Sequence, residues 1–200
     1  MISTNFIWVA LVVAVLGSLF YVKDTLAGIT RPNRVTFFLW GVAPLVSYFA
    51  QRSAHGGEQI LYTLVVALTP FAIVAASFMN KKAYWAITKF DVACGALSAL
   101  ALIMLLATHN GQLALVLSII ADLAAGLPTV LKSYKYPETE TALAYAAEVV
   151  SSLIVLLTIQ HWVFVDYSFV AYILFMNVLF TTLLIFPRPK TIARARRNTG

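Results

Sequence analysis

Two carboxylic acids, Asp122 and Glu148, lie inside long apolar stretches of this 200-residue chain. Asp122 lies ten residues before Lys132, and Glu148 lies nine residues after Thr139. At about 1.5 Å per helical residue, each acid is about 15 Å from a polar helix end, which is mid-depth in a bilayer core about 30 Å thick. A carboxyl group is costly there unless it is neutral, hydrogen-bonded or reached by water. Both acids are therefore candidate proton-coupling residues.

The composition predicts that these acids belong to an integral membrane protein. Hydrophobic residues make up 61% of the chain and charged residues 11%, whereas about a quarter of residues are charged in soluble domains. The single cysteine, Cys94, has no partner for a disulfide or a metal site. The net charge of +6 does not indicate a nucleic-acid partner, because the basic residues lie between apolar runs and in the tail.

Seven apolar runs are long enough to be membrane-spanning helices, since about 20 apolar residues cross a bilayer core. They cover roughly residues 6–22, 35–51, 59–79, 91–107, 112–132, 140–160 and 164–186. If all seven span, all but one of the 14 Lys and Arg residues fall on one side of the membrane, and Arg52 stands alone on the other. Because cytoplasmic loops carry such an excess, the N-terminus is predicted to lie outside and the C-terminus in the cytoplasm.

Part of the pattern recurs at an offset of 105 residues. The matching pairs are Pro32 with Pro137, Thr36 with Thr141, Trp40 with Tyr145, and Ser47 with Ser152. This recurrence predicts two parallel three-helix repeats, in residues 1–80 and 111–187, related by an axis along the membrane normal. A linker helix in residues 81–110 would join them in a three-one-three arrangement, and residues 188–200 would form a basic cytoplasmic tail. The predicted fold class is thus an all-α integral membrane protein.

The segment from Leu127 to Lys135, which reads Leu-Pro-Thr-Val-Leu-Lys-Ser-Tyr-Lys, resembles the Leu-Pro-Gln-x-x-Lys stretch of the PQ-loop and SWEET superfamily. The three-one-three layout and the outside N-terminus are similar as well. Thr129 replaces the glutamine of the motif, and the first repeat has Lys23-Asp24 at that place. The resemblance implies a transporter of a bacterial inner (plasma) membrane, with Asn177 in the last helix contacting the substrate.

Polar, small and aromatic residues form stripes at helical spacing on three predicted helices. The stripes are Ser118, Asp122, Ala125, Gly126, Thr129 and Ser133; Thr141, Tyr145, Glu148 and Ser152; and Thr36, Trp40, Pro44, Ser47 and Gln51. Such stripes can line a cavity, and they can also simply let membrane helices pack closely. Trp40, Tyr145 and Asn177 are the candidate substrate-binding residues. Pro44 and Pro128, which each free a backbone carbonyl inside a predicted span, are candidate hinges.

These patterns favour a small-solute transporter with one site between the repeats, where Asp122 and Glu148 can handle a proton. A non-transporting scaffold or sensor, in which the two acids hold helices together, is the alternative from a different class. An intramembrane enzyme acting on a lipid-like substrate is a third. No catalytic Ser-His arrangement, phosphate-binding loop or metal cluster is recognisable, so no enzyme, cofactor or metal is predicted. The expected partners are a solute and membrane lipid, while the solute's identity and the oligomeric state stay open.

Overall fold

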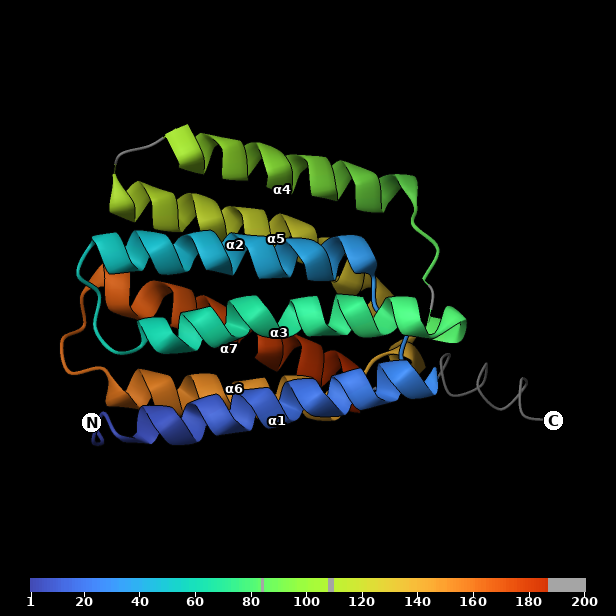
Figure 1. The fold of residues 1–200 in the computed structure, drawn as a ribbon, viewed down its shortest axis with the longest axis horizontal. Helices are drawn as coiled ribbons and strands as arrows, with labels where there is room; N and C mark the ends of the chain where they lie inside the picture. Colours follow the sequence, from blue (N-terminus) through green and yellow to red (C-terminus); the bar gives the residue numbers. More distant parts are fainter. Residues whose placement is uncertain (84, 108–109, 187–200) are drawn as a thin grey trace.

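The computed structural model describes residues 1–83, 85–107 and 110–186. Within these ranges the chain is helical and contains no strand, which confirms the all-α prediction. The α-helices are α1 (Phe6–Ala27), α2 (Arg34–Ser53), α3 (Ile60–Met79), α4 (Lys89–Ala107), α5 (Gly111–Lys135), α6 (Ala142–Thr158) and α7 (Phe164–Ile185). Short 3-10 turns cover Lys81–Ala83 and Pro137–Thr139. Figure 1 shows the helices side by side in one elongated bundle.

Each of the seven predicted apolar runs coincides with one of these helices to within a few residues. Four of the helices, α1, α3, α5 and α7, are long and apolar enough to cross a membrane. The helix α6 is apolar but shorter, with 17 residues. Helical membrane character is therefore supported by four helices, and the number of spans stays a prediction.

Large apolar side chains cover much of the outside of the bundle. On α1 they include Trp8, which is 62% exposed, and Val12, which is 58% exposed. On α4 they include Val92 and Ile103, exposed by 60% and 63%. Monomeric soluble proteins rarely expose contiguous apolar surface on this scale, so these outer faces suit a lipid environment.

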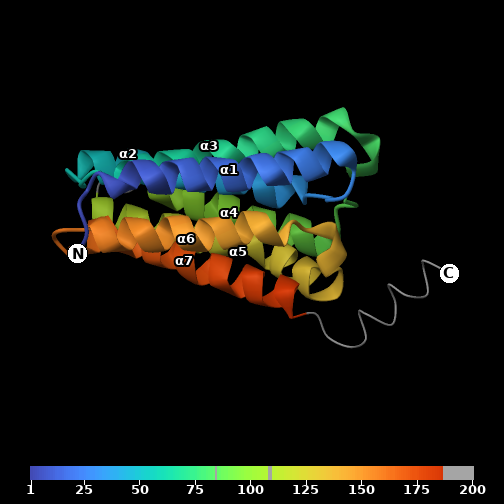
Figure 2. The ribbon, with the colours of Figure 1, turned by 90° about the horizontal axis from the view of Figure 1, so that it is seen from below.

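The helices pack in a regular order. The helix α3 lies against both α1 and α2, and α7 lies against both α5 and α6. Across the bundle, α1 packs against α6 and α2 packs against α5, while α4 covers the outside of α5 and also touches α2. Figure 2 shows α1 and α3 on one side of the bundle and α6 and α7 on the other. The interior is thus enclosed by six helices, with α4 at the periphery.

Local features of the chain explain where α2 and α5 begin and where α1 ends. Asn33 caps α2 by accepting hydrogen bonds from the backbone N–H groups of Val35 and Thr36. Asn110 caps α5 in the same way. Such caps satisfy backbone donors that have no partner inside the helix. Gly28 ends α1 with φ of 76°, a left-handed conformation that glycine adopts without strain.

The contact between α1 and α6 depends on small residues. At Gly17, an added Cβ atom would lie 2.6 Å from the Cβ of Ala147 and 3.2 Å from the carbonyl oxygen of Ala144. Only glycine therefore lets the two helices approach this closely. Further along the same contact, Ser151 Oγ donates to the carbonyl oxygen of Ala10 at 2.7 Å. Close approach and one buried polar bond hold this pair together, as is common between membrane helices.

The contact between α2 and α5 is held by several polar bonds. Thr36 Oγ1 donates to the carbonyl oxygen of Ala125 at 2.7 Å. Ser118 Oγ donates to the carbonyl oxygen of Ala43 at 2.8 Å and also hydrogen-bonds Ser47 Oγ. The polar stripes predicted on α2 and α5 are therefore turned toward each other, and at Ser47 and Ser118 they serve helix packing.

Candidate functional site

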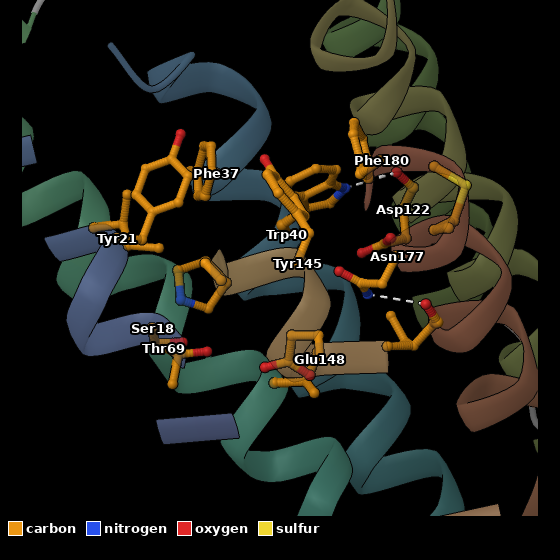
Figure 3. A pocket seen from close by; sticks show the side chains of 16 residues that line it. Ser18, Tyr21, Phe37, Trp40, Thr69, Asp122, Tyr145, Glu148, Asn177 and Phe180 are labelled. Carbon is orange, nitrogen blue, oxygen red and sulfur yellow. Dashed lines mark hydrogen bonds between the residues drawn. The ribbon is translucent and has the colours of Figure 1, made fainter. Parts of the chain in front are cut away.

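A cavity of about 90 Å³ lies in the interior of the bundle. Its lining comes from α1, α2, α3, α5, α6 and α7, and none of it comes from α4. Five residues singled out in the sequence as solute-binding or proton-coupling all line it: Trp40, Asp122, Tyr145, Glu148 and Asn177. Figure 3 shows these side chains around one space, although they come from four different helices. The structure therefore brings the predicted binding and proton-coupling residues together.

Each acid in the cavity accepts a hydrogen bond from a tyrosine on a neighbouring helix. The Tyr172 hydroxyl donates to Asp122 Oδ2 at 2.7 Å, and the Tyr62 hydroxyl donates to Glu148 Oε2 at 2.8 Å. Asp122 is 4% exposed. These bonds satisfy one oxygen of each carboxyl group, and no hydrogen bond to Asp122 Oδ1 or Glu148 Oε1 is seen in the described parts of the chain. Each acid thus has its own partner, and no hydrogen bond between the two acids is seen among the described residues.

Five aromatic rings form a closed circuit around one end of the cavity. Tyr21 contacts Phe37 with ring centroids 5.1 Å apart, and Phe37 contacts Trp40 at 5.2 Å. Trp40 contacts Phe180 at 5.6 Å, and Phe180 stacks on Tyr145 at 4.7 Å. Tyr145 returns to Tyr21 at 6.2 Å. All five rings line the cavity, so the aromatic circuit, Tyr21–Phe37–Trp40–Phe180–Tyr145, is part of the site.

A buried ion pair lies behind this circuit. Lys132 Nζ is 2.6 Å from Glu140 Oε1, and the two side chains are 1% and 0% exposed. Glu140 Oε2 accepts from the Tyr21 hydroxyl at 2.6 Å and from the Tyr145 hydroxyl at 2.8 Å. Lys132 Nζ also donates to the carbonyl oxygen of Arg31. This network therefore fixes two rings of the aromatic circuit from the end of the bundle where α1 and α5 finish.

Sequence reasoning missed this ion pair. Glu140 follows Lys132 by eight residues, across the turn that begins with Pro137. Two opposite charges that flank a short turn were the available signal. The same reasoning also missed Tyr21, Phe37 and Phe180, because an aromatic residue in an apolar run has the same pattern whether it faces lipid or a cavity.

The remaining predicted residues have distinct places. Asn177 Nδ2 donates to the carbonyl oxygen of Ile173 at 2.9 Å, and Figure 3 shows its amide oxygen turned the other way, toward the cavity. Pro44 and Pro128 are buried inside α2 and α5 but do not line the cavity. A third intrahelical proline, Pro70 of α3, does line it. The hinge role of Pro44 and Pro128 stays a prediction.

No family model, curated protein or solved structure matches the chain. In the part of the chain that the structure describes, no group of three or more His, Cys, Asp or Glu side chains could hold a metal ion. The cavity offers two carboxyl groups, an amide, two hydroxyls at Ser18 and Thr69, and five aromatic rings. Such a site can bind a small solute and can gain or lose protons.

Proposed function

We propose that the protein is a small-solute membrane transporter whose binding site is the interior cavity. The observation that carries this proposal is the convergence of Trp40, Tyr145, Asn177 and the two acids on one cavity between helices of both halves. Trp40, Tyr145 and Asn177 bind the solute. Asp122 and Glu148 exchange a proton as access to the cavity changes. Polar groups that meet in a concave site inside a membrane bundle are typical of substrate pathways.

The proposal includes seven membrane spans in a bacterial inner membrane, with the N-terminus outside and the C-terminus in the cytoplasm. The apolar outer faces of α1 and α4 support the location of the bundle in lipid. The uneven distribution of Lys and Arg supports the orientation. In this orientation the Lys132–Glu140 pair lies toward the cytoplasmic side of the cavity.

We also propose that the fold consists of two parallel three-helix repeats, α1–α3 and α5–α7, with α4 as the linker. In each set the third helix packs between the other two, which supports an equivalent arrangement. The contacts between the two sets are equivalent as well. The helix α1 packs against α6, and α5, the counterpart of α1, packs against α2, the counterpart of α6. Two parallel repeats, together with the segment around Pro128, are the basis for proposing a relationship to the PQ-loop and SWEET superfamily.

A scaffold or sensor is the second candidate function, and one observation favours it. Asp122 and Glu148 each receive a hydrogen bond from a tyrosine of another helix, so both acids also hold helices together. In a scaffold these bonds would be permanent. In a transporter at least one of them would break during the cycle.

A solute-uptake experiment separates the two functions. Purified full-length protein is screened by thermal shift against small metabolites, and stabilising solutes are then tested for uptake into proteoliposomes. We expect at least one solute to be taken up, and we expect Trp40→Leu to lower its uptake at subsaturating concentration at least about tenfold. A buried hot-spot aromatic typically contributes about 2 kcal/mol or more to binding, and about 1.4 kcal/mol corresponds to tenfold. Trp8→Leu, which changes a tryptophan that is 62% exposed on the outer face, is the matched control. Absence of uptake for every stabilising solute would favour the scaffold.

The orientation has its own test, by cysteine labelling of intact cells. In a Cys94→Ala background, single cysteines replace His55, between α2 and α3, or Lys82, between α3 and α4, both of which are exposed. An impermeant maleimide should label His55→Cys directly and Lys82→Cys only after the membrane is permeabilised, because the basic loops are predicted to be cytoplasmic. Direct labelling of Lys82→Cys in intact cells would contradict the proposed orientation.

A further inference from the structure

We propose that the cavity selects a small organic cation, with an ammonium group held by Asp122 and Glu148 against the aromatic circuit. This inference rests on the proposed transport function and names the class of solute. It follows from three features of the lining: its charge, its hydrogen-bonding groups and its aromatic faces.

The charged groups of the cavity are all acidic. Asp122 and Glu148 line it, and among the described residues no Lys, Arg or His side chain does. The buried lysine Lys132 is paired with Glu140 behind Tyr21 and Tyr145. Two carboxyl groups in an apolar surrounding are costly as anions unless a positive charge accompanies them. A cationic solute supplies that charge, whereas an anionic solute would add a third negative group.

The hydrogen-bonding groups point to the same class, because two of the three side-chain N–H donors of the lining are already in use. Trp40 Nε1 donates to the carbonyl oxygen of Asp122 at 3.1 Å. Asn177 Nδ2 donates to the carbonyl oxygen of Ile173 at 2.9 Å. The hydroxyls of Tyr21 and Tyr145 donate to Glu140.

The groups left for a solute are mainly acceptors. The acceptors are Asp122 Oδ1, Glu148 Oε1 and Asn177 Oδ1. The second N–H of Asn177 can donate, and the hydroxyls of Ser18 and Thr69 can serve as donor or acceptor. An ammonium group, which only donates, matches this set. A carboxylate or phosphate, which only accepts, would leave the acceptors of the protein and most of its own oxygens unpaired. A buried polar group without a partner weakens binding strongly, so the mismatch gives selectivity.

The aromatic circuit supplies the third feature. Its rings come from α1, α2, α6 and α7 and enclose one end of a cavity of about 90 Å³. The face of an aromatic ring carries a negative partial charge and attracts cations, most strongly for tryptophan and most of all when water is excluded. Trp40 is part of the circuit, and its indole N–H is bonded to the main chain of Asp122, so the ring is held beside the acid.

The test compares cations with neutral molecules of the same shape. Purified full-length protein is titrated by calorimetry, at constant ionic strength, with choline and its carbon analogue 3,3-dimethyl-1-butanol, and with ethanolamine and 1-propanol. Each pair differs mainly by a positively charged nitrogen in place of carbon. We expect the cation of at least one pair to bind about tenfold or more tightly than its analogue. Equal binding within both pairs, or no binding of either cation, would overturn the proposal.

Matched variants test where the cation binds. The double variant Asp122→Asn/Glu148→Gln should lose at least about 30-fold in cation affinity, since a buried charge partner is removed. Trp40→Leu should weaken cation binding about five- to thirtyfold. The double variant Glu58→Gln/Glu138→Gln removes the same net charge from two exposed positions and should leave the affinity unchanged. An equal loss of cation affinity in this control would show that binding depends on the net charge of the protein. That result would contradict a cation site at Asp122 and Glu148.

The outcome for transport is separate. Uptake of a neutral or anionic solute into proteoliposomes, without cation binding, would support the transport function and contradict the cation site. Binding of a cation that never crosses the membrane would support the cation site and contradict the transport function. Cation binding together with cation uptake supports both.

Discussion

Replacing Lys132 with methionine is expected to lower the free energy of unfolding by about 3–5 kcal/mol. Methionine fills a similar space but leaves Glu140, whose side chain is 0% exposed, without its positive partner. It also removes the donor to the carbonyl oxygen of Arg31 and a cation over the ring of Trp85, whose centroid lies 4.9 Å from Lys132 Nζ. The loss is measured as reversible unfolding in mixed micelles, or as a fall in Tm.

Two further variants identify the ion pair as the cause. In Lys132→Met/Glu140→Gln the buried charge is gone, while the amide oxygen still accepts from Tyr21 and Tyr145. We therefore expect the double variant to regain part of the lost stability. Lys135→Met changes an exposed lysine one turn away and should shift stability by less than about 0.5 kcal/mol. A double variant less stable than Lys132→Met would contradict the buried-charge explanation.

Asp122→Asn is expected to abolish the pH dependence of solute uptake while leaving a folded protein. Asparagine keeps the shape of the side chain and an oxygen that can accept from the Tyr172 hydroxyl, which donates to Asp122 Oδ2 at 2.7 Å. It cannot exchange a proton. If the acid changes protonation as the cavity changes its exposure, the variant will transport at a rate that no longer follows pH. Initial uptake rates measured in proteoliposomes between pH 5 and pH 8 provide the test.

The control for this result is Glu138→Gln, which neutralises an exposed acid outside the cavity and should retain the wild-type pH profile. Glu148→Gln shows whether the second acid shares the proton. An Asp122→Asn protein that unfolds, or that keeps the wild-type pH profile, would show instead that the acid is structural. The first half of the chain has Gly17 and Ala43 at the matching positions, so it offers no substitute group.

The helices could be located from the sequence because apolar length is a strong signal in a membrane protein. The starts of α2 and α5 agree with the predicted runs to within one residue. Part of the site was predictable for a related reason. Asp122 and Glu148 stand out against their apolar surroundings. Helical spacing places Tyr145 on the same face as Glu148, and the offset of 105 residues pairs Tyr145 with Trp40. A polar residue in an apolar run needs an explanation, and here the cavity provides one.

The rest of the site depends on which helices are neighbours, and that information is not local in sequence. Tyr21 and Glu140 are 119 residues apart and form a hydrogen bond only because α1 packs beside α6. Phe180 completes the aromatic circuit from the last helix. A ring that faces a cavity and a ring that faces lipid have the same apolar pattern, so only the packing of α1, α6 and α7 distinguishes them.

The polar bonds between α2 and α5 limit how the bundle can move. They run from Ser118 near mid-bundle to Thr36 at the start of α2, and three of them end on main-chain carbonyl oxygens, at Ala43, Asp122 and Ala125. Sliding one helix past the other would break all of these bonds together, so α2 and α5 should move as one unit. In the proposed transporter, the displacement that admits and releases a solute would then involve movement of α1, α3, α6 and α7 relative to this pair. The pair that carries Asp122 would keep its internal packing while the opposite side of the cavity moves.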